Sequence, residues 1–215
     1  MGVPLETGLR YDSVPVCITH EDRPRQVKTL DDRELVALAQ EGDVQAFEVL
    51  VRRYRNDVFA LSTRFVRNRE EAWDISQEVF VKAWRSLGRF RGDAGFKTWL
   101  LRIAANHSKD WLKKRRLDTV VFDDAVQARA PSGAQGPGET AEARELGAAI
   151  QQAIDALPHK HKLAFILREF EGLSYQEMAE VMQCNQGTVM SRLHHARKKL
   201  QNALTRMGVA GDAGP

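Results

Sequence analysis

Apolar side chains recur at intervals of three and four residues along most of this chain, and this spacing constrains its fold more than any other feature. The pattern is clearest from Leu35 to Leu61 and from Leu146 to Leu157. Residues spaced in this way lie on one face of an α-helix, whereas no stretch shows the alternation of a half-buried β-strand. The sequence therefore predicts an all-α fold.

Capping and turn residues predict where the helices begin and end. Asp31 or Asp32 suits the N-cap of a first helix, and the pair at 42–43, Gly-Asp, suits a turn before a second. Pro158 ends a later helix. We expect further helices over 69–87, 96–113, 141–157, 159–171, 174–182 and 186–205.

A stretch rich in glycine, proline, alanine and serine, ARAPSGAQGPGET at 128–140, interrupts the helical pattern. This composition is typical of a flexible linker, and 215 residues can hold two small domains. We therefore predict two helical domains at 29–116 and 141–206, a flexible linker at 117–140, and disordered tails at 1–28 and 207–215.

Positive charge is concentrated in two blocks, although the net charge is only +3. From Arg85 to Arg116 there are ten Lys or Arg residues against two acids, and from Gln186 to Arg206 there are five against none. Segregation of this kind is typical of nucleic-acid-binding proteins. It predicts two separate contacts with a polyanion.

Other classes of protein leave no signature in the sequence. No apolar run is long enough to cross a membrane, and the N-terminus lacks the features of a signal peptide, so we expect a cytoplasmic protein. Cys17 and Cys184 are too few for a disulfide framework. Cys17 and His20 have no second ligand pair at zinc-like spacing. We expect no metal, no cofactor and, without a candidate nucleophile or phosphate loop, no enzymatic activity.

The second basic block has the pattern of a helix-turn-helix. Ser174 and Glu177 form a capping box, and a short polar turn at 183–186 precedes the next helix. Winding that helix places an apolar stripe on one side and leaves a basic, hydrogen-bonding side that fits a major groove. The stripe comprises Val189, Leu193, Ala196 and Leu200. The alternative is an amphipathic surface helix with solvated charges.

The helix expected at 69–87 exposes Asp74, Gln77 and Glu78 on one face, because these residues are three and four apart. No histidine or third carboxylate joins them, so catalysis and metal binding are disfavoured. We interpret this face as a protein contact, and a solvated acidic surface is the alternative.

Three segments, DISQEVFVKAW, FRGDAGFKTWLLRIAANHSKDWLKKRR and LREFEGLSYQEMAEVMQCNQGTVMSRLHHARKKL, together resemble the RpoE-like, extracytoplasmic-function (ECF) group of bacterial sigma factors, group IV of the sigma-70 family. The resemblance implies a sigma-2 domain, a linker and a sigma-4 helix-turn-helix domain. It implies that Asp74, Gln77 and Glu78 dock on the clamp helices of the largest subunits of core RNA polymerase, and that sigma-4 contacts the polymerase flap. An anti-sigma factor, in some cases membrane-bound, is a further implied partner.

The resemblance also assigns the −35 promoter element to the last helix. The expected contact residues are Thr188, Met190, Ser191, Arg192, His194, His195, Arg197 and Lys198. Many relatives carry Arg or Lys where this chain has Met190, and Arg where it has His195. Each bidentate arginine contact to guanine is worth roughly 1–3 kcal/mol of discrimination. The usual −35 consensus of the family is therefore not expected to apply unchanged to this chain.

The first basic block is expected to hold the opened −10 strand, which requires cations for phosphates and pockets or π-faces for bases. Winding the helix at 96–113 leaves one basic strip between apolar sectors, with Trp99 at its edge and Trp111 in the core. The resemblance implies that the loop at 88–95 and Asn106 form a pocket for a flipped base. Trp99 fits either base stacking or core packing. The expected single-strand residues are Arg89, Arg91, Lys97, Trp99, Arg102, Asn106, Lys109 and Lys113.

A second hypothesis accounts for the helix-turn-helix without the polymerase. In it, the chain is a free-standing helix-turn-helix transcriptional repressor or activator with an N-terminal dimerisation or sensing domain. The segment DISQEVF and the helix at 96–113 favour the sigma factor, because a repressor needs neither a polymerase-binding face nor a surface for single strands. Neither hypothesis requires membrane insertion.

Overall fold

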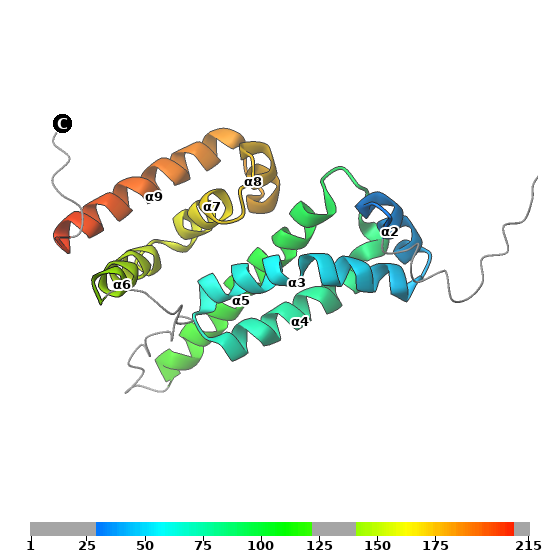
Figure 1. Cartoon of the computed structure of the whole chain (residues 1–215), viewed down its shortest axis with the longest axis horizontal. Coiled ribbons are helices and arrows are strands. Elements are labelled where there is room, and N and C mark those ends of the chain that lie inside the picture. Colours follow the sequence, from blue (N-terminus) through cyan, green and yellow to red (C-terminus); the bar gives the residue numbers. More distant parts are fainter. Residues whose placement is uncertain (1–28, 122–140, 209–215) are drawn as a thin grey trace, which may run out of the picture.

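The computed structural model describes residues 29–121 and 141–208, with side chains described for 29–115 and 143–208. Every regular element in these ranges is helical, as predicted (Figure 1). The elements are α2 (Asp32–Gln40), α3 (Val44–Val66), α4 (Arg69–Ser86), the 3₁₀ turn η1 (Leu87–Arg89), α5 (Phe96–Val121), α6 (Ala141–Asp155), α7 (His159–Glu169), α8 (Tyr175–Met182) and α9 (Gln186–Arg206).

The first domain comprises α2 to α5, and local caps define its helix starts. Asp31 and Glu34 form a capping box at α2, and the Asp43 carboxylate accepts hydrogen bonds from two backbone amides at the start of α3. These caps satisfy N–H groups that have no partner inside the helix. Helices α3, α4 and α5 pack on one another around fully buried side chains such as Leu61 and Leu100.

The second domain comprises α6 to α9. The predicted capping box of Ser174 and Glu177 is present at α8, which ends at Gln183 in a left-handed conformation. The polar turn then leads to α9, where the Asn185 side chain accepts a hydrogen bond from the amide of Thr188. Helix α9 packs along α7, α8 and α6.

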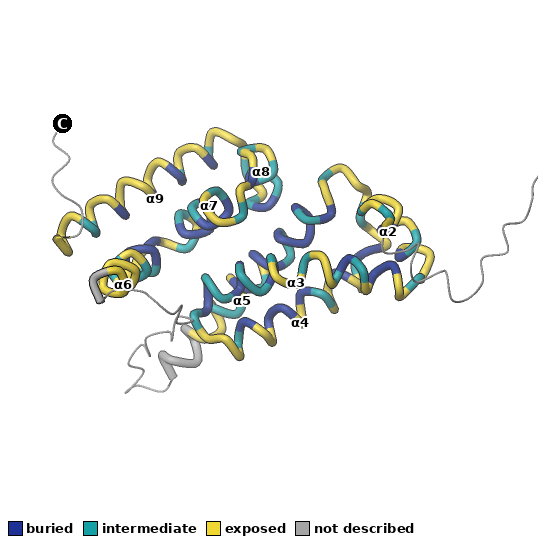
Figure 2. Tube along the Cα trace, in the orientation of Figure 1, coloured by how far each residue is buried: buried dark blue, intermediate teal, exposed yellow. Residues whose placement is uncertain are grey.

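The two domains pack against each other. A single cluster of buried apolar residues continues from α3 and α5 of the first domain into α7, α8 and α9 of the second. Helix α8 lies on α5, and α9 occupies the side of the second domain that faces away from the first (Figures 1 and 2). The all-α fold with two helical domains is therefore confirmed, and their mutual packing is a feature that the sequence did not indicate.

The C-terminal end of α5 differs from the sequence expectation. Helix α5 continues to Val121, past the predicted domain end at residue 116. No helix in the described parts of the chain is long and apolar enough to span a membrane. The predicted tail at 1–28 with Cys17, most of the predicted linker and residues 209–215 lie outside the described residues, while Cys184 is a free thiol.

Candidate nucleic-acid interface

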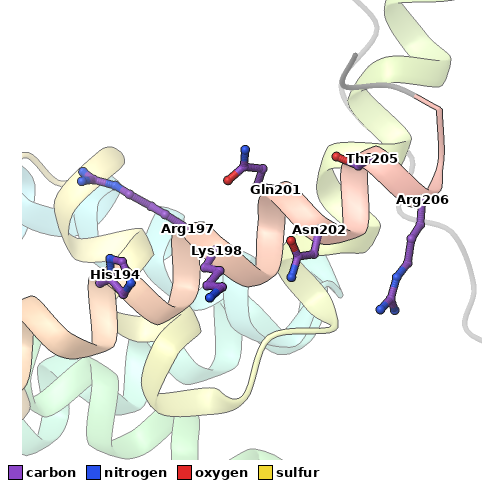
Figure 3. A pocket seen from close by; sticks show the side chains of 7 residues that line it. All are labelled: His194, Arg197, Lys198, Gln201, Asn202, Thr205 and Arg206. Atoms are coloured by element: carbon purple, nitrogen blue, oxygen red, sulfur yellow. The ribbon is translucent and has the colours of Figure 1, made fainter. Parts of the chain in front are cut away.

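Helix α9 presents a polar, basic face to solvent. Its apolar stripe is buried as predicted, with Val189 and Ala196 fully enclosed. The opposite side forms an open pocket in which all the side chains come from α9 itself (Figure 3). These residues are His194, Arg197, Lys198, Gln201, Asn202, Thr205 and Arg206. A helix packed along one side with a cationic side left open has the geometry needed to enter a major groove.

The predicted −35 residues do not all share this exposed face. Met190, Ser191, His194, His195, Arg197 and Lys198 are exposed. Thr188 and Arg192 are half-buried, and one Arg192 guanidinium nitrogen donates to Cys184 Sγ at 3.4 Å. Arg197 forms an exposed ion pair with Glu169 at 2.8 Å. Arg192 is therefore directed toward the turn rather than outward.

Three histidines gather where α9 passes α7. The ring of His195 lies 5.9 Å from that of His161 and 5.6 Å from that of His194, measured between centroids. Burial, followed by the nearby His195 and Lys199, lowers the pKa of His161. The described residues include no group of three or more potential ligands arranged to hold a metal ion. His194 and His195 are exposed on α9 and place two imidazoles on its basic face.

The basic strip of α5 is only partly open. Asn106, Lys109 and Lys113 are exposed, and Arg102 is half-buried. Lys97 Nζ contacts Asp57 Oδ1 of α3 at 3.2 Å. The strip therefore begins beside a carboxylate of its own domain and opens further along α5.

Trp99 belongs to the core and not to the strip. Its side chain is 8% exposed, and its ring centroid lies 5.0 Å from that of Phe90 and 5.6 Å from that of Phe96. Winding α5 placed Trp99 at an edge, but Phe90 from the preceding segment covers that edge. In this conformation Trp99 offers no free π-face to a base. Trp111, expected in the core, is half-buried against it.

The loop before α5 is held by a residue that the sequence interpretation did not single out. Gln40 of α2 donates from Nε2 to the backbone oxygens of Leu87 and Phe90, at 2.9 and 2.8 Å. Leu87 is the first residue of η1 and Phe90 follows its last, and exposed Arg89 and Arg91 lie beside Phe90. The contact joins residues 47 and 50 positions apart in the chain, so no local pattern could reveal it.

The acidic face of α4 is exposed, as the spacing predicted for Asp74, Gln77 and Glu78. Glu78 Oε2 lies 2.9 Å from Nε2 of His107 on α5, and Lys82 contacts the other ring nitrogen of His107. Burial, followed by the Lys82 charge, lowers the pKa of His107. A neutral imidazole can accept at Nδ1 from the lysine and donate at Nε2 to the carboxylate. His107 therefore links Glu78 and Lys82 of α4 through one ring, while the Glu78 side chain stays 64% exposed.

Large apolar side chains flank these acids. Trp73 is 57% exposed, and Val81 and Trp84 are also exposed. Together with Gln77 they occupy successive turns on one side of α4, adjacent to Asp74. Exposed aromatic surface beside ordered charge is typical of protein-binding faces. The spacing of Trp73, Gln77 and Val81 was visible in the sequence and could have identified this part of the face.

Comparisons with known proteins identify the family. Residues 50–117 match the model for sigma-70 region 2, and residues 147–200 match the model for sigma-70 region 4. The chain is 42% identical to the RNA polymerase sigma-H factor of Pseudomonas aeruginosa over 180 residues, covering 80% of this chain and 93% of the relative. The chain belongs to the extracytoplasmic-function sigma factors of the sigma-70 family.

Two further relatives agree with this assignment. The ECF sigma-E factor of Escherichia coli K12 is 38% identical to this sigma factor, over 80% of this chain and 94% of the relative. The structure of CnrH in complex with the cytosolic domain of CnrY matches with a TM-score of 0.61 and 26% identity, covering 81% of this chain and 97% of CnrH. Region 2 of this sigma factor extends from within α3 into α5, and region 4 from within α6 into α9.

Proposed function

We propose that this sigma factor recruits core RNA polymerase to specific promoters through two DNA-binding surfaces and one polymerase-binding face. It acts in the cytoplasm as a non-enzymatic subunit. The observation that carries the proposal is the presence, in one chain, of an open basic helix in region 4 and an acidic and aromatic face on α4 in region 2. A free-standing repressor has no use for the second surface.

The α4 face supports docking on a basic protein surface. Asp74 and Glu78 supply charge, Gln77 supplies an amide, and Trp73 and Val81 supply apolar area at the centre. Complementary charges steer association, while buried aromatic residues contribute most of the affinity. The clamp helices of the largest polymerase subunits, which the family resemblance implies, are the partner that we assign to this face. The polymerase flap is assigned to region 4.

The outer face of α9 supports readout of the −35 duplex. Ser191, His194, Arg197 and Lys198 are exposed together and can reach base edges and phosphates. The exposed Met190 provides an apolar contact in place of a hydrogen-bond donor, and such contacts suit the thymine methyl group. A −35 preference different from the usual family consensus follows from this composition.

The loop at 88–95 and the exposed part of α5 support capture of the opened −10 strand. The Asn106 amide can donate and accept on a base edge, while Arg89, Arg91 and Lys113 supply positive charge for phosphates. Trp99 is left out of this set because its ring is enclosed by Phe90 and Phe96.

We further propose that an anti-sigma protein holds this factor inactive. CnrH was solved in complex with the cytosolic domain of CnrY. A partner that binds through a cytosolic domain is compatible with a membrane-anchored anti-sigma protein.

Run-off transcription by core polymerase, with and without the protein, on a promoter library tests the proposal. We expect transcripts only when the protein is present. Asn106→Ala should impair promoter opening more than polymerase binding, and Glu78→Gln should impair polymerase binding. Glu70→Gln, an exposed acid in the first turn of the same helix, is the matched control. The sigma-factor assignment fails if no promoter responds while the isolated protein binds a palindromic duplex tightly.

A further inference from the structure

Acidic residues of the second domain contact arginines at the end of α3. The Arg64 guanidinium lies 3.7 Å from Glu171 Oε1, and Arg67 pairs with Asp155. Neither arginine belongs to the basic blocks recognised in the sequence. Both are half-buried beneath the second domain, although long cationic side chains are normally solvated.

Two of the lysines expected to bind the single strand lie near the same boundary between the two domains. The charge of Lys97 contributes to lowering the pKa of Glu171 and of Glu177, although burial dominates at Glu171 and raises its pKa overall. Lys109 lies close enough to His159 to help burial lower the pKa of that histidine. Arg64, Arg67 and Lys97 are therefore half-buried beside the second domain, whereas Lys109 lies next to it with an exposed side chain.

The residue pair at 170–171 offers Arg64 an aromatic ring and a carboxylate together. The Phe170 ring stacks on the guanidinium of Arg64, with 4.2 Å between Cζ and the ring centroid. The next side chain, Glu171, presents its carboxylate to the same arginine. Nucleic acids offer arginine this combination, a π-face from a base and an anionic oxygen from a phosphate. Phe170 remains 47% exposed, so its contact with Arg64 does not enclose it in a core.

The contact between the domains is incompletely satisfied. The Glu171 side chain is only 4% exposed, and burial raises its pKa. Within the described residues, Arg67 Nε and His159 Nε2 are buried without a hydrogen-bond partner. Removing charges and polar groups from water costs free energy, and incomplete hydrogen bonding offsets only part of that cost. Such a contact can be displaced by a ligand that pairs with the arginines better.

We propose that Arg64 and Arg67 form a binding site for the phosphodiester backbone of single-stranded DNA, and that Phe170, Glu171 and Asp155 occupy this site in the unbound protein as an internal competitor. The site extends the surface formed by Lys97 and Lys109, and in this respect it rests on the proposed function. Guanidinium groups bind carboxylates and phosphates in the same bidentate manner, so one anion can replace the other. Single-strand binding and the closed arrangement of the two domains are therefore mutually exclusive.

Titration of the full chain with a fluorescently labelled, single-stranded oligonucleotide of mixed sequence tests whether Glu171 competes for the site. Glu171→Gln should raise the affinity roughly tenfold, as expected when a competitor that fills a site most of the time is removed. Glu48→Gln removes the same charge from an exposed ion pair with Arg52 and controls for net charge. An equal gain in both variants, or none in either, would show that Glu171 does not compete with the oligonucleotide and would overturn the proposal.

Salt dependence tests the site itself. In the Glu171→Gln background, Arg64→Gln should weaken binding and reduce the slope of log affinity against log salt by about 0.7, the value for one phosphate contact on a single strand. An unchanged slope overturns the phosphate assignment of Arg64.

Hydrogen exchange provides a readout that does not depend on affinity. Backbone amides at 170–173 should exchange faster when the oligonucleotide is bound, because the competitor is displaced. Slower exchange there overturns the proposal. Absence of oligonucleotide binding in every variant also overturns it, and run-off transcription can still succeed in that case, so the two proposals fail separately.

Discussion

The basic faces of α5 and α9 have similar compositions but different surroundings. On α9, His194 and Lys198 project into solvent from a helix that is packed along one stripe. On α5, Lys97 contacts Asp57, and the second domain lies close to Lys97 and Lys109. The difference shows that a block of cations in a sequence predicts a preference for polyanions and does not predict access to them. Access depends on the arrangement of the two domains.

The largest expected effect concerns the core that the two domains share. Leu100→Ala in α5 and Leu193→Ala in α9 each remove a nearly fully buried side chain and should lower the free energy of unfolding by about 2–5 kcal/mol. Because one apolar cluster includes both residues, both variants should shift a single transition in urea unfolding followed by circular dichroism. Two separate transitions, with each variant affecting only one, would contradict a shared core.

A smaller effect should distinguish the two basic faces directly. Arg197→Ala should weaken binding to a −35 duplex and reduce the salt slope by about 0.9, the value for one phosphate contact on duplex DNA. Lys97→Ala, on the covered face, should leave both quantities unchanged. Fluorescence anisotropy across a salt series measures them. If both variants flatten the slope equally, duplex DNA contacts both faces and the distinction between them is lost.

The smallest effect concerns the helix that supports α9. Hydrogen bonds from the Ser174 hydroxyl and amide lower the pKa of Glu177 in the folded protein. Because the folded pKa lies below the usual value of 4.5, this carboxylate stabilises the fold above that pH, and the stabilisation is lost as the pH falls through the folded pKa. Glu177→Gln should lower stability by roughly 0.2–1 kcal/mol at neutral pH.

Thermal unfolding from neutral to acidic pH measures this contribution. The difference between the wild type and Glu177→Gln should disappear in acid. A difference that persists unchanged at the lowest pH would mean that the glutamate does not stabilise the helix through its charge.

Helix positions were predictable because the signals for them are local. The capping boxes at Asp31 and Ser174 each join residues three apart, and the stripe on α9 follows from helical periodicity alone. The exposure of Asp74, Gln77 and Glu78 was predicted in the same way. Functional assignments for these residues come from the family and stay predictions until they are tested.

Features that depend on residues far apart in the sequence were not predictable. Periodicity gave the angle of Trp99 on α5, but Phe90 from outside the helix determines that it is buried. Arg64 and Glu171 lie in different domains, and neither belongs to a motif. A single sequence shows which residues share a helix face, and tertiary contacts then determine whether that face is open.

The contact of Gln40 with η1 has a consequence for how promoter preference can change. One amide fixes both carbonyls at the base of the loop, so the anchor does not depend on the side chains of residues 91–95. Those residues can be exchanged for other sequences while the entry of the loop stays in place. Under the proposed function, exchanging residues 91–95 between relatives that keep this glutamine should change −10 specificity without disturbing the start of the loop.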